Sequence, residues 1–446
     1  MNFDDIGLGV PKILLPNTNI DLNKWAVVAC DQYTSEPEYW QEIKGDIETS
    51  ASTLNVIFPE VYLEDNDGDK RILDINTKMD AYLNDGTLIE QKEGFILLDR
   101  KTSHAPSRKG LMVALDLERY DYSVGSQTLI RATEGTIVDR LPPRVKIREQ
   151  ASIELPHIMV LIDDPDETVI EPLFNEKLET VYDFELMKNS GHLKGFSVDN
   201  PELIEKTANS LRQLAKQEVF DSKYGVSDKG VLLFAMGDGN HSLATAKNIW
   251  ESKKAQAANK EDVMGDPARY ALVELVNVHD QGLEFEPIHR VVFNIDSEDM
   301  LKSMQSYFQN QGSNCILERY DSLEECKAQI SKKSSDNMQL FTFTDAQGPG
   351  IVTLANPKLN LEVGNLQAFI DEYLSKHSDS SVDYIHGEDV VTRLGSEKNS
   401  MGFYLPVMGK GELFKTVVLD GALPRKTFSM GEADEKRFYL EARRIK

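Results

Sequence analysis

The stretch at residues 234–250, FAMGDGNHSLATAKNIW, decides the predicted fold, because it joins an apolar run to a helical pattern through two glycines. The run covers residues 231–236, which is the length of a buried strand. Beyond the glycines, Leu243, Ala246 and Trp250 recur at the spacing of one helix face. We therefore predict a strand, a tight turn and a helix.

The turn between these elements has the composition of an anion site. Gly237 and Gly239 permit positive φ and a close approach of another group to the backbone, and Asn240 is the expected N-cap. A helix that starts there presents free N–H groups and the positive end of its dipole. Asp238 would repel a phosphate unless Mg²⁺ or a shared proton lies between them. Alternatively, Asp238 takes a proton from the attacking hydroxyl.

A plain turn is the alternative interpretation. Asp-Gly-Asn is a common turn sequence, and a histidine such as His241 is often only a neighbour of a helix cap. The chain lacks the GxxxxGK[ST], HExxH and CxxC motifs, and GLG at residues 7–9 has neither a third glycine nor a preceding strand. Spacing alone leaves both interpretations open.

The composition limits the class of protein. A chain of 446 residues suggests two or three domains. The net charge of −25 argues against a nucleic-acid partner and against docking on anionic membranes. Three cysteines without metal-type spacing, and no apparent secretory signal, favour reduced thiols in the cytoplasm. We expect a cytoplasmic protein that acts on small molecules, and its oligomeric state stays open.

The predicted elements follow one another in a mixed order, so we predict the α+β class rather than a regular α/β alternation. Strands are expected at residues 25–30, 93–100, 110–122, 158–162, 270–278 and 289–295, and a further hairpin at 338–357. Helices are expected at residues 200–218, 297–311 and 365–376. The pattern of expected strands and helices changes near residue 295, which predicts a core at 1–295 and a second α+β domain at 296–446.

Four motifs in the correct order resemble a bacterial family, the domain of unknown function 1015. GDGNHSLATA at residues 237–246 is similar to that family's DGHHRxxxA signature, and the others lie at residues 129–161, 280–292 and 421–430. Together these motifs span most of the chain. The residues that the resemblance carries over are Arg131, Glu134, Thr136, Arg144, His289, Arg290, Pro424 and Lys426, with Arg148 close by.

The DG-x-H element also resembles the superfamily of ParB partition proteins, sulfiredoxin and free serine kinases. This resemblance implies a mixed-sheet ParB/sulfiredoxin-like core whose loop and helix start hold a phosphate-bearing ligand. It further implies a Mg²⁺-dependent phosphotransferase that converts L-serine to O-phospho-L-serine with pyrophosphate, ADP or ATP. Where relatives have His-His-Arg, this chain has Asn240-His241-Ser242. The missing arginine would have clamped a phosphate, so pyrophosphate is the preferred donor and another cation must compensate.

The polar segment CDQYTSEPEYW at residues 30–40 supplies substrate-binding candidates. Asp31 and Glu36 offer carboxylates for a base or for the substrate ammonium, and Thr34 and Ser35 offer hydroxyl donors. The alternative is structural, because Ser35 with Glu38 would form a capping box.

The roles expected from these observations fall into four groups. The catalytic candidates are Asp238, Glu36 and His241, and Asp238 is also the candidate Mg²⁺ ligand. The phosphate-binding candidates are Gly237, Gly239, Asn240, Ser242, Arg131, Thr136, Arg144, Arg148, His289, Arg290 and Lys426. The substrate-binding candidates are Asp31, Thr34, Ser35 and Glu134. Alternatively, the arginines form exposed ion pairs that contribute little to stability. His289 and Arg290 would alternatively join one domain to the other.

Three rival functions remain open. The chain would act as a ParB-like nucleotide-binding protein if it bound a nucleotide without turnover. It would act as a sensor if it only bound serine or phosphoserine. The same site with water as acceptor would make it a phosphoserine phosphatase.

Overall fold

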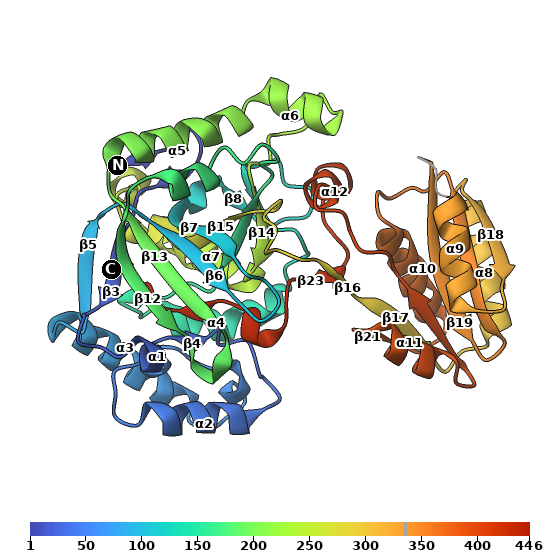
Figure 1. Ribbon diagram of the computed structural model, residues 1–446, viewed down its shortest axis with the longest axis horizontal. Helices are drawn as coiled ribbons and strands as arrows, with labels where there is room; N and C mark the ends of the chain where they lie inside the picture. Colours follow the sequence, from blue (N-terminus) through green and yellow to red (C-terminus); the bar gives the residue numbers. More distant parts are fainter. Residues whose placement is uncertain (334–336) are drawn as a thin grey trace. The chain divides into compact units, whose positions relative to one another are not determined.

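The computed structural model describes residues 1–333 and 337–446, which form two compact units (Figure 1). The first unit comprises Met1–Glu284 and Gly431–Lys446, and the second comprises Phe285–Met430. This division differs from the expected one in two ways, since the boundary precedes residue 295 and the C-terminal segment Gly431–Lys446 returns to the first unit. No helix in the described ranges has the length and apolarity to cross a membrane.

The first unit is built on a large mixed sheet, which confirms the α+β class. Its strands lie in the order β12 (Glu179–Glu185), β13 (His192–Val198), β6 (Phe95–Lys101), β7 (Arg108–Asp116), β15 (Tyr270–Asn277), β11 (Met159–Ile162), β14 (Phe234–Asp238), β9 (Ile130–Arg131) and β8 (Tyr120–Asp121), with β2 (Leu8–Gly9) on β7 and β1 (Asn2–Phe3) on β2. Pairing is antiparallel from β12 to β15, whereas β15–β11, β14–β9 and β9–β8 are parallel. β11 and β14 are antiparallel.

Both faces of this sheet are buried, which explains its nearly continuous apolar runs. The expected strands β6 and β7 pair as a hairpin, in which Leu97 lies opposite Leu111 and both belong to one hydrophobic cluster. Their neighbours Leu98 and Met112 point to the opposite face and belong to another. Successive side chains of each strand therefore point to opposite faces of the sheet, and each face packs into its own hydrophobic core.

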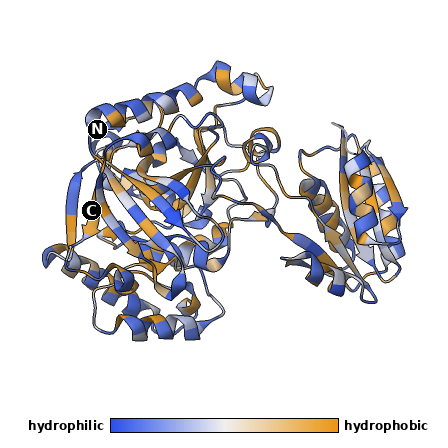
Figure 2. Cartoon of the chain, in the orientation of Figure 1, coloured by the Kyte–Doolittle hydropathy of each residue, from blue (hydrophilic) through white to orange (hydrophobic). Residues whose placement is uncertain are grey.

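Helices cover both faces of the sheet. One face packs against α5 (Pro201–Leu214) and α7 (Asn240–Gln256), whose Leu243, Ala246 and Trp250 are buried as predicted. α5 begins as predicted, because the Asn200 side chain accepts a hydrogen bond from the amide of Glu202, and Figure 2 shows hydrophilic and hydrophobic residues mixed along it. The other face packs against α2 (Pro37–Ile47) and α3 (Gly68–Asn84), near the pair β3 (Lys12–Pro16) and β5 (Leu88–Glu93). The remaining helices of this unit are α1 (Leu22–Trp25), α4 (Leu141–Arg148) and α6 (Gln217–Tyr224).

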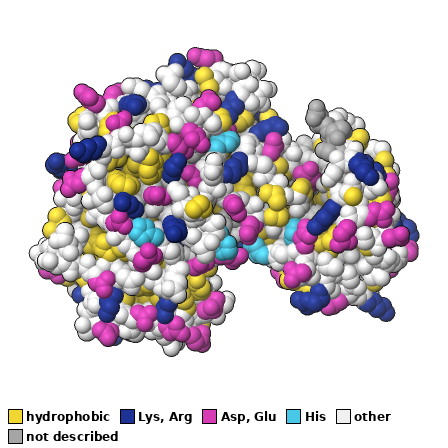
Figure 3. Space-filling view, viewed as in Figure 1, with side chains coloured by type: hydrophobic (Ala, Val, Ile, Leu, Met, Phe, Trp, Pro, Cys, Tyr) yellow, Lys and Arg dark blue, Asp and Glu magenta, His cyan; other side chains and the backbone are white. Residues whose placement is uncertain are grey.

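The charge excess is distributed over the surface. Figure 3 shows acidic and basic side chains interspersed over the face in view. Typical pairs are those of Arg212 on α5, 2.7 Å from Asp5 and 3.0 Å from Glu205. Exposed pairs of this kind contribute about 1 kcal/mol or less each.

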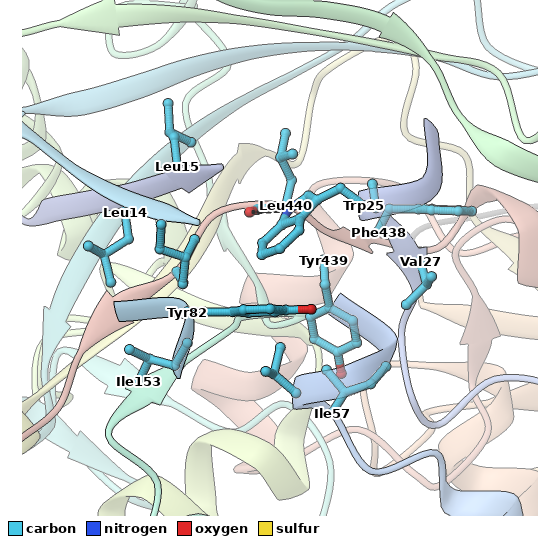
Figure 4. Close-up of a cluster of buried hydrophobic side chains, with 14 of the residues drawn as sticks. Leu14, Leu15, Trp25, Val27, Ile57, Tyr82, Ile153, Phe438, Tyr439 and Leu440 are labelled. Carbon is cyan, nitrogen blue, oxygen red and sulfur yellow. Dashed lines mark hydrogen bonds between the residues drawn. The ribbon is translucent and has the colours of Figure 1, made fainter. Parts of the chain in front are cut away.

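The C-terminal segment completes the core under the sheet. β24 (Phe438–Tyr439) pairs with β4 (Val27–Val28), and β25 (Arg443–Arg444) pairs with β10 (Ile153–Glu154). The strand expected at residues 25–30 is shorter than predicted, because Trp25 ends α1 and its Nε1 donates to the Leu440 carbonyl at 3.1 Å. Figure 4 shows Phe438, Tyr439 and Leu440 among Trp25 and other core side chains from the N-terminal half.

A buried charge network also holds this segment. The Arg437 guanidinium pairs with Glu274 of β15 and with Glu441, and Tyr182 of β12 donates to Glu441. Burial opposes ionisation of Glu274, but Arg437 and Arg108 more than offset it and hold its pKa below the usual value. The segment is therefore anchored by charges as well as by apolar contacts.

The second unit is a smaller α+β layer. Its sheet has the order β18 (Asn314–Arg319), β20 (Gly348–Ala355), β19 (Met338–Asp345), β22 (Ser400–Tyr404), β17 (His289–Phe293) and β21 (Ser381–Ile385), all antiparallel. A separate pair joins β16 (Glu286–Pro287) to β23 (Phe428–Ser429). Its helices are α8 (Ser297–Asn310), α9 (Leu323–Lys333), α10 (Glu362–Lys376), α11 (Glu388–Gly395) and α12 (Glu412–Asp420). The hairpin predicted at residues 338–357 and the helices predicted at 297–311 and 365–376 are confirmed.

Candidate functional site

The predicted turn is shorter than expected, because Gly237 and Asp238 belong to β14 and only Gly239 lies between β14 and α7. Gly239 has φ +79°, and a Cβ there would lie 3.0 Å from the Ile158 Cα, so both the backbone angle and the close approach require glycine. Gly239, rather than Asn240, is the N-cap of α7, which corrects the sequence-based assignment. The left-handed glycine makes Asn240 the first helical residue, and the amide of Leu243 donates to the Gly239 carbonyl at 3.1 Å.

Asp238 sits beside a lysine from the far end of the chain. One carboxylate oxygen accepts from the Gly239 amide at 2.8 Å, and the other lies 3.2 Å from Lys436 Nζ. The two side chains are 32% and 19% exposed, so solvent reaches both. Lys436 is therefore the cation paired with Asp238, in a position that solvent reaches.

His157 connects the start of α7 to the C-terminal segment. Its Nε2 lies 3.0 Å from Ser242 Oγ, and its Nδ1 lies 2.7 Å from the Tyr439 hydroxyl. The Tyr439 oxygen also accepts from the Cys30 amide at 3.2 Å, and burial raises the pKa of this phenol well above its usual value. The protonated phenol can therefore donate to Nδ1 when that nitrogen carries no proton.

Asp31 faces the same histidine, with Oδ2 3.8 Å from His157 Nε2. Burial opposes its ionisation, but His157, the side chain of Gln32 and Lys436 more than offset that cost and hold the pKa of Asp31 below its usual value. Asp31 and Asp238 thus both lie in the field of Lys436. This arrangement differs from a nucleophilic triad, because Asp31 and Ser242 are both at Nε2 and Nδ1 is taken by the phenol.

The lowered pKa of Asp31 predicts a pH-dependent stability. Its contribution is present above the ordinary carboxyl value of about 4 and is lost as the pH falls through the lower folded-state value. We expect the difference in unfolding free energy between the wild type and Asp31→Asn to be constant near neutral pH and to shrink on acidification. Urea unfolding at several pH values, followed by tryptophan fluorescence, measures this difference, since Trp25, Trp40 and Trp250 all lie in the first unit. A difference that grows below pH 4 would contradict the assignment.

An apolar cavity of about 140 Å³ adjoins this cluster. His157, Ser242, Cys30 and Tyr439 contribute to its lining, as do Arg144 and Arg148 of α4. α4 packs beside α7. The structure therefore brings Arg144, Arg148 and Ser242 to the lining of one cavity.

Both cavity arginines are already paired with carboxylates. Arg144 contacts Glu60, and Arg148 contacts Glu154, which also binds Arg443. Burial opposes ionisation of Glu154, but Arg443 and Arg148 hold its pKa below the usual value. These pairs argue against the predicted role of Arg144 and Arg148 as a phosphate clamp, because an incoming anion would have to displace a carboxylate.

Arg131 has a structural environment. Its side chain is buried, its Nε donates to the Thr128 carbonyl at 2.8 Å, and Nη2 donates to the carbonyls of Gly230 and Val231. Burial lowers its pKa to about 10. These bonds link the segments that precede β9 and β14. They argue against Arg131 as a phosphate ligand. Glu134 and Thr136 follow in the loop before α4, both partly buried.

The hydroxyl and carboxylate candidates after Asp31 are outward-facing. Thr34, Ser35 and Glu36 are all exposed. Glu36, rather than Ser35, is the N-cap of α2, so the alternative capping box with Glu38 is also corrected. His241 lies in the first turn of α7, partly buried, where its carbonyl accepts from Thr245 Oγ1.

Three candidates belong to the second unit. His289 is buried, its Nδ1 accepts from the Leu405 amide at 3.1 Å, and burial lowers its pKa to about 4. The Arg290 guanidinium is fully buried, where it donates to Gln367 and lies 4.8 Å from the ring centroid of Tyr384. Both have the contacts of core residues within that unit, which argues against a phosphate-binding role. Lys426 is exposed, with φ +56°.

The residues near Asp238 can supply few metal ligands. Among residues 1–333 and 337–446, no group of three or more His, Cys, Asp or Glu side chains could hold a metal ion. Mg²⁺ commonly uses one or two protein carboxylates and completes its shell with phosphate oxygens and water. Asp238 and Asp31 are the carboxylates of this region, and they already contact Lys436 and His157, respectively.

Sequence reasoning missed three members of the cluster, namely His157, Lys436 and Tyr439. The basic composition of the C-terminal segment was the available signal for Lys436, with seven basic against four acidic residues from Pro424 onward. His157 and Tyr439 lie within apolar strand patterns, where the sequence gives no motif that indicates a functional role.

Several solved structures are similar to this chain at low identity. A free serine kinase in complex with AMP has 8% identity, a TM-score of 0.37, and coverage of 75% of this chain and 92% of that chain. A conserved hypothetical protein from Pyrococcus furiosus has 11% identity and a TM-score of 0.34, with 75% and 95% covered. SbnI with a C-terminal truncation, from Staphylococcus aureus, has 10% identity and a TM-score of 0.33, with 72% and 82% covered. Since all three TM-scores lie below 0.5, these likenesses support no conclusion about activity.

The family comparison is more decisive. A search of curated proteins gave no match. A family model described as a protein of unknown function, DUF1015, matches residues 14–380, which confirms the motif resemblance. Because these residues make up well over half of the sequence, the chain belongs to the DUF1015 family.

Proposed function

We propose that this protein is a phosphotransferase that transfers a phosphoryl group to the hydroxyl of free L-serine, giving O-phospho-L-serine. The observation that carries the proposal is the placement of Asp238 between the start of α7 and Lys436 Nζ, 3.2 Å away. A carboxylate, a cation and a helix N-terminus are the groups that a phosphoryl acceptor site needs. The motif resemblance to free serine kinases supplies the substrate, and a ParB/sulfiredoxin-like core is part of the same proposal.

Lys436 and the first turn of α7 hold the transferring group. The ammonium offers charge to the phosphoryl oxygens, and the helix start offers amide donors. Ser242 Oγ, fixed by His157, is a further donor at this position. The chain thereby replaces the arginine that relatives have at residue 242 with a lysine from the C-terminal segment.

Asp238 is the proposed base. The serine oxygen attacks phosphorus, the bond from phosphorus to the donor's leaving oxygen breaks, and the serine hydroxyl proton passes to Asp238. Once Asp238 is neutral, Lys436 pairs with the phosphate ester instead. Glu36 is the less suitable base, because it is exposed at the start of α2. Mg²⁺, when bound, neutralises phosphate charge, and Asp238 with Asp31 would hold it.

Direct assay tests the proposal. The protein is incubated with L-serine and Mg²⁺ and, separately, with pyrophosphate, ADP and ATP, and phosphoserine is measured by mass spectrometry. We expect phosphoserine with at least one of these donors and its loss after chelation of Mg²⁺. Release of inorganic phosphate from phosphoserine, without synthesis from any donor, would favour the phosphatase instead. Absence of both reactions would reject phosphoryl transfer at this site.

Removing the cation should weaken donor binding. We expect Lys436→Gln to raise the KM for the phosphate donor by about tenfold or more, because one charge-assisted contact is lost. Lys101→Gln is the matched control, since Lys101 is exposed on β6. Steady-state kinetics measure both variants, and an unchanged KM in Lys436→Gln would remove this lysine from the site.

A further inference from the structure

The cavity beside His157 and Ser242 is walled mostly by apolar side chains. Among them are Val56 and Phe58 of the loop after α2, Met79 of α3, Ile147 of α4, Ile153 of β10 and Leu272 of β15. Most of these residues are themselves buried, so the surface that they offer is fixed by the core. Neither serine nor pyrophosphate has an apolar part that would use such a wall.

The charged residues of the cavity cancel one another. Arg144 is paired with Glu60, and Arg148 with Glu154. Two paired cations and two paired anions leave no net charge for an ionic ligand, and a buried charge without a partner is costly. The cavity therefore suits an uncharged group, whereas Lys436, which is paired with Asp238, lies outside its lining.

The volume is that of a single ring. An apolar cavity of about 150 Å³ stays dry and binds benzene, and this cavity has about 140 Å³. Ser242 belongs both to the cavity lining and to the first turn of α7. A phosphate at that turn would thus place a short organic substituent at the cavity.

We infer that the cavity binds an uncharged, ring-sized apolar group carried by the phosphate compound that uses this site. The inference rests on the proposed phosphoryl-transfer site and narrows its ligand to an organic phosphate with a ring, in place of pyrophosphate. Binding to the apolar wall supplies affinity in proportion to the apolar area removed from water. The phosphate group binds at the start of α7.

Calorimetric titration with two phosphate monoesters tests the inference. We expect phenyl phosphate to bind about tenfold or more tightly than methyl phosphate, because only the phenyl ring reaches the apolar wall. Ala151 also lines the cavity, so Ala151→Phe and Ile147→Phe each place a ring in it. Both variants should remove the preference while leaving methyl phosphate binding unchanged. Ile316→Phe is the matched control, since Ile316 is exposed in the second unit. Circular dichroism confirms that each variant is folded, and the two filling variants provide independent tests.

Equal affinity for the two esters, or a preference that survives both filling variants, would overturn the inference. Failure to bind either ester would also overturn it. Benzyl alcohol, a ring with a hydroxyl and no phosphate, is the third probe. If it bound at the same cavity more tightly than phenyl phosphate, the ring would belong to the acceptor and the inference would fail. A phenyl preference together with no phosphoserine synthesis would instead reject the serine kinase chemistry and leave the cavity assignment in place.

Discussion

Asp238→Asn is expected to lower kcat for phosphoserine formation by about a thousandfold, which lies within the rate factor that a general base usually contributes. The amide cannot accept the serine proton, yet it is isosteric and can still accept the Gly239 amide bond. The exchange of the carboxylate for an amide should leave the fold intact, because the side chain is partly exposed and its partner Lys436 also reaches solvent. Phosphoserine measured over time, with protein folding checked by circular dichroism, gives the result.

Asp228→Asn is the matched control for this variant, because Asp228 is exposed and makes no ion pair with any residue that the structure describes. It should keep the wild-type rate. A wild-type rate in Asp238→Asn would remove Asp238 from the chemistry, and Glu36 would become the base to test. A loss of rate accompanied by unfolding would show that Asp238 has a structural role instead.

Arg437→Met is expected to destabilise the first unit by about 3–5 kcal/mol, the effect of leaving buried charges without a partner. The Arg437 side chain is 4% exposed, and its partners Glu274 and Glu441 are 2% and 0% exposed. Methionine fills similar space but cannot pair with either carboxylate. Because Lys436 precedes this anchor, the variant should also lose donor binding under conditions where it remains folded.

Arg444→Met provides the comparison for stability. Arg444 is 48% exposed and lies 3.8 Å from Glu90, so its removal should cost about 1 kcal/mol or less. Urea unfolding followed by tryptophan fluorescence reports the first unit in both variants. Equal stabilities of the two variants would show that the buried network does not anchor the C-terminal segment.

Local patterns predicted much of the secondary structure. The strands β6 and β7, part of β14, the start of α5 at Pro201 and the buried face of α7 follow from periodicity and capping, which depend on neighbours in the chain. The helix start was placed one residue away from its observed position. The cause is the left-handed Gly239, which is needed because Ile158 approaches it from another strand.

The candidate site was predicted only in part. The turn with Asp238 and the positions of Asp31 and Ser242 were identified, and the structure brings them near one lysine and one histidine. The predicted roles of the arginines depend on their partners, which their sequence neighbours do not reveal. Arg131 is satisfied by carbonyl groups and Arg148 by Glu154, and each partner is set by packing.

The sequence by itself determined the α+β class, the family and the glycine turn that starts α7. These depend on residue types at short spacing and on motifs whose order a single chain displays. Only the tertiary structure decided that Gly431–Lys446 returns to the first unit, that Lys436 stands beside Asp238 and that the cavity arginines are neutralised. Those contacts join residues far apart in the chain, and burial of apolar surface and pairing of buried charges selected them.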